Sequence, residues 1–428
     1  MAYSERNISE MQKRIAPRVY GNLDLDIAPE RFRSELGENS ILKKNKRITE
    51  HLADPEKVEF FRQLTLMGDP LADAYAALIP ELGFRKIREM LEAAINQGIA
   101  AVPDAPAELK TFIGAVDEKP SWLDMESVER AARFMRLPTA LWGDYALRVA
   151  FMNTYVNGYQ GLPMIITGAL TSDSAGRRMA ETASTFKLAV LPGALDRGGE
   201  AYRSVLMVRL MHAMVRGNLL RKKEVWDFSV YGLPIPQVDQ MGAALVTSYM
   251  LAKRALKAGR PFNQLERDIV ELNRYTAFLL GMHDQFLSAE PEQIVETWEM
   301  CQATLRHMHD PRGKQLNEAT LTAYRRPTTS LFNRALHFLD SNANRFMYGK
   351  IVGRRTAEEM GVEAGLKESL SFATLFMPLG VNYSALYMAD KVPALHKLID
   401  RFAVKKINKQ LHAEGAPEYK TDSKSYAM

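Results

Sequence analysis

Residues 172–221 read SDSAGRRMAETASTFKLAVLPGALDRGGEAYRSVLMVRLMHAMVRGNLLR, and both halves of this stretch repeat apolar side chains at helical spacing. A serine at position 172 or 174 is a suitable N-cap for a first helix that runs to about residue 190. Residues 192–199 begin Pro-Gly and end Gly-Gly, which predicts a turn before a second helix over 199–221. Helices joined so closely are expected to lie antiparallel.

The same helical spacing recurs along most of the chain. Further helices are predicted over 82–98, 125–136, 240–258, 264–287, 292–308 and 390–412. Alternation of period two is scarce, and no repeat of about 20–50 residues is visible. The sequence therefore predicts an all-α protein, with one large helical domain packed around one core.

The composition excludes several classes of protein. The chain has 428 residues, of which 46% are hydrophobic and 25% charged, so a disordered or collagen-like chain is excluded. The net charge of +5 is too thinly spread to predict a nucleic-acid partner. The single cysteine, Cys301, excludes an intramolecular disulfide, a Cys-rich metal site and a C-x-x-C-H haem attachment.

The ends of the chain and its apolar runs give expectations about organisation and location. Residues 1–59 are expected to form a polar N-terminal extension, 60–390 a helical domain, and 391–428 a C-terminal helix with a flexible tail. The polar N-terminus does not resemble a signal peptide, and no run approaches about 18 apolar residues. We therefore expect a cytoplasmic protein without a spanning helix. The apolar run 371–387 fits either a pocket wall or an element at a membrane surface.

Several common catalytic sites are missing. The sequence has no G-x-S-x-G, no Walker A loop and no G-x-G-x-x-G. None of the eight histidines has a glutamate three residues before it, which excludes a ferritin-like di-iron bundle. The pair His307 and His309 is interpreted as surface residues at a helix end, because alternate positions do not share a helix face.

One histidine is placed differently. In the second helix of the opening stretch, His212 shares a face with apolar residues at helical spacing, namely Val205, Val208, Val215 and Leu219. Arg209 and Arg216 flank it, and buried unpaired charges would be costly. One interpretation is a hydrogen-bonded core histidine. The other is a haem whose iron binds His212, whose ring lies on the stripe around Val208, and whose propionates pair with the two arginines.

The first helix carries a polar set on one face: Arg178, Glu181 and Thr182. At about 1.5 Å rise per residue, this set stands at a height similar to that of His212 on the second helix. The set would then lie near a ligand held by His212. A local i,i+3 ion pair between Arg178 and Glu181 on the surface is the alternative.

Several short motifs support a family resemblance. They are Arg178-x-x-x-Thr182, Gly198-Gly199, Tyr202-Arg203, Arg209-Leu210-Met211-His212-Ala213, Gly232-Leu233-Pro234-Ile235-Pro236-Gln237-x-Asp239, Gly68-Asp69-Pro70-Leu71-Ala72-Asp73-Ala74 and Pro120-x-Trp122-x-Asp124. With them, roughly residues 60–390 resemble the oxygenase family that includes the bacterial latex-clearing proteins and the MpaB-type enzymes.

The resemblance implies a globin-like haem b core with extra helices, O2 as co-substrate, and particular residue roles. His212 matches the proximal iron ligand and Arg209 the arginine one turn before it, while Arg178 and Thr182 match the distal pair. Glu181 stands where the rubber-cleaving branch has a lysine, and residues 159–170 hold no acid, so the sequence departs from that branch.

The expected function is therefore that of a haem b-dependent oxygenase acting on an apolar, unsaturated small molecule. Arg178 and Thr182 would donate hydrogen bonds to oxygen, and Glu181 would act as a base toward the substrate. Two alternatives remain open at this point. One is a haem-binding protein without oxygenase turnover, and the other is a non-haem helical scaffold or peripheral membrane protein.

Overall fold

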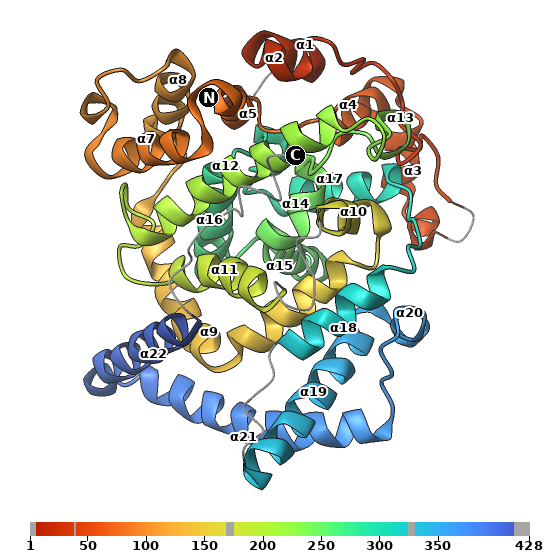
Figure 1. Ribbon diagram of the computed structural model, residues 1–428. Helices are drawn as coiled ribbons and strands as arrows, with labels where there is room; N and C mark the ends of the chain where they lie inside the picture. The colour runs from red at the N-terminus through yellow and green to blue at the C-terminus, as the bar shows by residue number, and fades with distance from the viewer. Residues whose placement is uncertain (1–5, 38–39, 168–174, 324–329, 415–428) are drawn as a thin grey trace. The chain divides into compact units, whose positions relative to one another are not determined.

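Every regular element described in the computed structural model is helical, which confirms the all-α prediction (Figure 1). The structure describes residues 6–37, 40–167, 175–323 and 330–414, without the side chains of residues 41, 175–179, 322, 323 and 414. Within these ranges the one contact of β type is an isolated bridge between Phe32 and Leu305.

The chain divides into two compact units, each built from separate segments. Unit 1 contains residues 1–131 and 193–307, and unit 2 contains residues 132–192 and 308–420. The unit boundaries fall at other positions than the segment limits predicted at residues 59 and 390. The opening stretch of the sequence is itself divided, because its first helix belongs to unit 2 and its second to unit 1.

Both segments of unit 1 contribute helices. They are α1 (Ile8–Ile15), α2 (Pro17–Tyr20), η1 (Ile41–Lys44), α3 (Lys46–Leu52), α4 (Pro55–Thr65), α5 (Pro70–Ala76), α6 (Ile79–Leu82), α7 (Phe84–Gln97), η2 (Ile99–Ala101), α8 (Ala107–Asp117), α12 (Glu200–Arg221), α13 (Phe228–Tyr231), α14 (Gln237–Ala244), α15 (Val246–Lys257), α16 (Gln264–Leu279), η3 (Asp284–Phe286) and α17 (Pro291–Thr304). The long helix α12 packs against α5 and α16. The N-terminal residues also join this core, because Ile8 and Tyr20 are fully buried.

Unit 2 contains most of α9 (Met125–Thr154) together with α10 (Gly158–Ile166), α11 (Ala175–Leu188), α18 (Gly313–Ala323), α19 (Leu331–Val352), α20 (Arg354–Glu359), α21 (Leu366–Asp390) and α22 (Pro393–Glu414). Its main helix pair is α19 with α21. A buried cluster centred on Met152, Tyr155 and Tyr348 joins α9 to α18 and α19.

The helix boundaries differ from prediction where backbone chemistry intervenes. The predicted helix 240–258 is broken at Leu245, whose φ of −124° separates α14 from α15. The predicted helix 264–287 ends at Leu279, since Gly281 adopts a left-handed φ of +75°. In the opposite direction, α9 continues through Pro138 to Thr154, well beyond the predicted residue 136. A proline removes one backbone hydrogen bond, and the side-chain packing of a long helix outweighs that loss.

Among the described residues, none of the helices combines the length and the apolar character that crossing a bilayer would require.

Candidate active site

His212 lies in the middle of α12, on the least covered stripe of an otherwise buried helix. Gly199 is the N-cap of this helix, and Gly198 before it has a φ of +79°, which the predicted turn requires. Val205 and Leu219 at the two ends of the stripe are buried. Val208, His212 and Val215 between them each keep part of their surface exposed. The stripe predicted from sequence therefore exists, and its middle is partly exposed.

The surroundings of His212 favour the neutral imidazole. Burial, and after it the positive charge of Arg216, lower the pKa of His212 to about 4. The carboxylate of Asp69 and a side-chain hydrogen bond with Gln240 act in the opposite direction but do not prevail. Near neutral pH the ring is uncharged, which is the form that binds a metal.

Gln240, on α14, lies within hydrogen-bonding range of the His212 ring. An imidazole has two ring nitrogens, and a hydrogen bond at one of them fixes the orientation of the other. The predicted site did not include Gln240, although it directly follows the segment Gly232–Asp239 on which the family resemblance rests.

Arg209 is held by Asp69, the N-cap residue of α5. Its Nε and Nη2 donate to the two carboxylate oxygens of Asp69 at 2.6 and 2.8 Å, and both side chains are less than 5% exposed. Its Nη1 donates to the carbonyl of Leu279 at 3.3 Å. Gly281 lies so close that an added Cβ would stand 2.5 Å from Nη2, which explains a glycine at this position.

Arg216 makes the second pair with α5 and is fully buried. It donates to the carboxylate of Asp73, and also to the carbonyls of Pro234 at 3.0 Å and Ile235 at 2.9 Å. Ile235 has a φ of +50°, rare for a β-branched residue, and this strained backbone aims its carbonyl at the guanidinium. Tyr20 donates its hydroxyl to the same carboxylate, and burial raises the pKa of Asp73 to about 6.

These ion pairs correct the reasoning about the two arginines. One of the two interpretations of the sequence paired these buried guanidinium groups with haem propionates as counter-ions. Asp69 and Asp73 already supply the counter-ions from within unit 1. The sequence did not predict these partners, because Asp69 precedes Arg209 by 140 residues and Asp73 precedes Arg216 by 143. The resemblance had singled out their segment, Gly68–Ala74, without a role.

Two glutamines connect the backbone segments that surround these ion pairs. Gln237 donates from Nε2 to the carbonyls of Gly68 at 2.7 Å and Gly281 at 2.8 Å, and accepts from the backbone N–H of His283 at 2.6 Å. Gln12 accepts from the N–H of Gly68 at 2.8 Å. The segments around residues 68, 237 and 281 are therefore tied together directly beside the two arginines of α12.

The other predicted residues lie on α11, which belongs to unit 2. Glu181 is buried at 8% exposure and Thr182 is partly exposed. The side chain of Arg178 lies outside the described residues. Lys187 on the same helix is fully buried, with its Nζ 2.6 Å from Asp144 of α9. The predicted proximity of Arg178, Glu181 and Thr182 to His212 would be a contact between the two units, and it stays a prediction.

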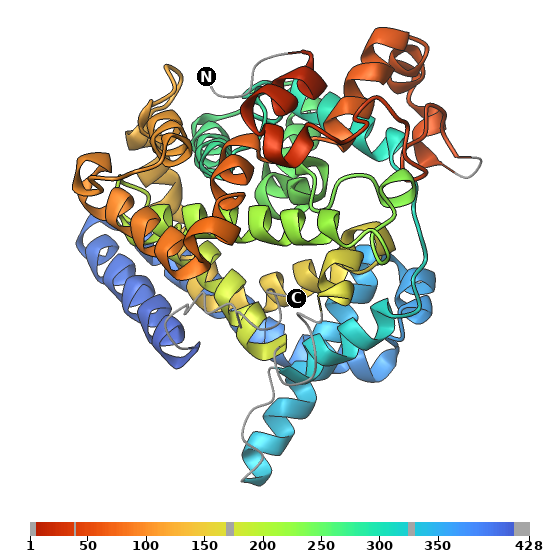
Figure 2. The ribbon, with the colours of Figure 1, turned by 45° about the horizontal axis from the view of Figure 1, so that its top comes forward.

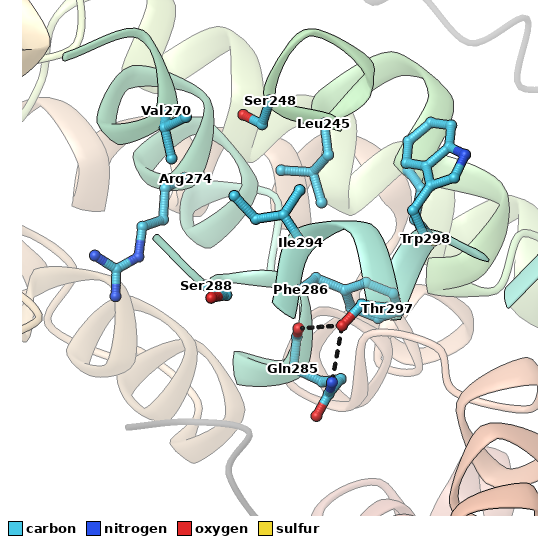
Figure 3. A pocket seen from close by; sticks show the side chains of 11 residues that line it. Leu245, Ser248, Val270, Arg274, Gln285, Phe286, Ser288, Ile294, Thr297 and Trp298 are labelled. Atoms are coloured by element: carbon cyan, nitrogen blue, oxygen red, sulfur yellow. Dashed lines mark hydrogen bonds between the residues drawn. The ribbon is translucent and has the colours of Figure 1, made fainter. Parts of the chain in front are cut away.

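A separate pocket of about 350 Å³, including the part open to solvent, lies among α14–α17 and η3 of unit 1 (Figure 3). Arg274 is its one ionisable lining residue, and that guanidinium stacks on Trp122 at 3.8 Å and lies 3.4 Å from Glu271. Gln285 and Thr297 satisfy each other through a 2.8 Å hydrogen bond. None of the predicted site residues lines this pocket.

Comparison with known proteins defines the class. The family model described as "ER-bound oxygenase mpaB/B'/Rubber oxygenase, catalytic domain" matches residues 132–379, more than half of the chain. The chain therefore belongs to this family of oxygenase catalytic domains, as its sequence motifs had indicated.

Two relatives agree with this assignment. The chain is 24% identical to a rubber oxygenase of Streptomyces sp. (strain K30) over 229 residues, which cover 50% of this chain and 53% of that protein. The match thus spans about half the length of the curated relative. A solved structure of latex clearing protein in the closed state superposes with a TM-score of 0.56 at 19% identity, covering 82% of this chain and 91% of that one. That likeness confirms the fold.

Proposed function

We propose that this protein is a haem b-dependent oxygenase that uses O2 to oxidise an apolar, unsaturated small molecule. Membership of the oxygenase family supports the reaction class. The observation that carries the haem assignment is His212, a neutral imidazole on the partly open stripe of a buried helix. The cytoplasmic location expected from the sequence is part of the same proposal.

The residues around His212 fit the group. A haem needs one neutral imidazole and a flat apolar wall, and the stripe offers His212 between Val208 and Val215. Gln240 orients the ring as an outer-shell partner orients a metal-binding histidine. When bound, the haem iron supplies the activation of O2 that protein side chains cannot perform.

The role of Arg209 and Arg216 in this proposal is to position α12. Each is committed to a buried carboxylate of α5, and Arg216 also binds two backbone carbonyls. Breaking one partner of such a pair leaves an uncompensated buried charge. The two pairs lie one turn before and one turn after His212, and they resist rotation of the helix that presents it. Contact of either arginine with propionates stays a proposal.

On α11, Glu181 is proposed as the base that takes a proton from the substrate, and Thr182 and Arg178 as hydrogen-bond donors near the reacting oxygen. The burial of Glu181 supports the first role, because a general base acts on a substrate held away from bulk water. The partial exposure of Thr182 supports the second.

Oxygen consumption with paired substrates tests the proposal. Unsaturated isoprenoid alcohols and unsaturated fatty acids are compared with their fully hydrogenated counterparts in an oxygen electrode, and products are identified by mass spectrometry. We expect uptake of O2 and oxygen-containing products only with the unsaturated member of a pair. Haem-loaded protein that consumes no O2 with any of them would contradict the oxygenase assignment.

Glu181→Gln separates the proposed base from the binding of haem. We expect at least a hundredfold lower turnover with unchanged haem content, which is the usual contribution of a general base. The matched control is Glu118→Gln at the end of α8 in unit 1. Full activity of the Glu181 variant would remove this residue from the mechanism.

A further inference from the structure

Helix α21 of unit 2 is apolar on all its faces, yet one face is uncovered. Residues 369–389 contain no charged side chain. Its inner face carries aromatic rings that pack within the unit: Phe376 lies 4.5 Å from Phe372 and 4.8 Å from Tyr145, and Tyr383 lies 5.1 Å from Trp142, measured between ring centroids. A helix that is hydrophobic all round is normally buried all round.

The uncovered apolar residues form a stripe along one side of the helix. Its large apolar residues are mostly exposed, at positions that recur on one helix face: Leu366 (76%), Leu370 (59%), Met377 (70%), Val381 (70%) and Met388 (61%). We call this set the α21 face. Large exposed apolar patches of this kind mark a surface that another body covers.

The next helix continues the pattern and adds positive charge. In α22, Leu395, Leu398 and Phe402 are between 40% and 58% exposed. Four exposed cations stand among and beyond them: Lys397, Arg401, Lys405 and Lys409. An amphipathic helix with cations beside its apolar residues is typical of a membrane surface. Leu331 and Phe332, in the first turn of α19, are 82% and 71% exposed. Figure 2 shows that this end of α19 projects from the other helices of unit 2.

The charges around the α21 face indicate which kind of surface it contacts. Residues 366–413 contain seven Lys or Arg and three acids. All three acids are paired: Glu368 with Lys367 at 3.4 Å, Asp390 with His396 at 2.9 Å, and Asp400 with Arg136 at 2.9 Å. A second copy of the chain would bring like charge against like charge. A bilayer with anionic headgroups offers an apolar interior and the opposite charge.

We propose that unit 2 docks on anionic lipid bilayers, with the α21 face in the acyl–headgroup boundary and the cations of α22 on the phosphates. The helix lies in the plane of the interface. This inference is independent of the haem chemistry, since all its residues are on α19, α21 and α22.

Co-sedimentation of the full chain with lipid vesicles tests the apolar part. Vesicles of phosphatidylcholine alone are compared with vesicles that also contain phosphatidylserine, and we expect binding to the second kind. Met377→Asp should weaken that binding at least ~10-fold, because it places a charge in the interface. The matched control is Met250→Asp in unit 1, where the methionine is 65% exposed. Equal binding of both variants would overturn the proposal.

Removing charge tests the electrostatic part. Lys405→Gln combined with Lys409→Gln should weaken binding roughly fivefold per cation and reduce its dependence on salt. Lys86→Gln combined with Lys110→Gln, two exposed lysines of unit 1, should leave both unchanged.

Sedimentation equilibrium without lipid tests whether a second copy of the chain, instead of a bilayer, covers the α21 face. The proposal expects a mass that does not change with Met377→Asp. A concentration-dependent dimer that this substitution abolishes would assign the α21 face to a second copy and overturn the proposal, as would vesicle binding that ignores phosphatidylserine.

Discussion

At the scale of single residues, the proposed chemistry depends on His212 and its hydrogen-bond partner Gln240. The periodicity of α12 is sufficient to predict that His212 lies on a stripe with Val208 and Val215. It is not sufficient to predict Gln240, because a contact between α12 and α14 depends on tertiary packing. Inward histidines are common in sequences, and it is the partner and the open stripe that make this one a ligand candidate.

Gln240→Leu tests the outer partner of the histidine. Loss of the hydrogen bond leaves the ring free to turn, and we expect haem to dissociate about 10- to 100-fold faster. The rate is measured by transfer of haem to an excess of apomyoglobin. Gln97→Leu, at the exposed end of α7, is the control. An unchanged rate would mean that Gln240 does not orient the ring.

Asp73→Asn tests the deepest ion pair. The substitution leaves the guanidinium of Arg216 buried without its counter-ion, and we expect a loss of about 3–5 kcal/mol in the free energy of unfolding. Urea denaturation followed by circular dichroism measures it. Glu81→Gln breaks the exposed pair with Arg18, where both side chains are more than half exposed, and should cost under about 1 kcal/mol. Equal losses would contradict the structural role of the buried pair.

At the scale of helices, periodicity and caps carried most of the prediction. The helices expected over 174–190 and 199–221 are α11 and α12 to within a few residues. Where the prediction failed, the local sequence was misleading. No proline and no glycine at the helix end marks the break at Leu245, while Pro138 suggests a break that side-chain packing of α9 overrides. Sequence patterns record backbone preferences, and packing sets the final ends.

The start of α16 yields a prediction about pH. Hydrogen bonds from Arg260 and Arg254 and from the N–H of Asn263 lower the pKa of Glu266 to about 2, against the opposing effect of burial. Because the folded state holds the ionised form more strongly, its stabilisation is complete above about pH 4.5 and is lost as the pH falls toward 2.

Glu266→Gln should therefore lower the free energy of unfolding by about 2 kcal/mol at pH 6, where solvent screening of the exposed arginines limits the effect. The gap between variant and wild type should narrow between pH 4.5 and pH 3. Urea titrations at several pH values measure it, with the exposed Glu89→Gln as control. A gap that stays constant with pH would contradict the role of the carboxylate.

At the scale of the whole molecule, the all-α class and the family follow from helical periodicity and short motifs. The division into units does not, because α11 and α12 are neighbours in sequence but belong to different units. The counter-ions of Arg209 and Arg216 could not be predicted either, because each lies about 140 residues from its arginine in the sequence. Motifs locate such segments, and only the fold shows which residues pair.

The visible absorption spectrum of the purified protein, with its iron content, tests the central claim most directly. We predict a Soret band and close to one iron per chain in the wild type, with both lost in His212→Ala and both kept in His307→Ala. Full haem content in the His212→Ala protein would show that another residue, or none, holds the iron, and would contradict the account.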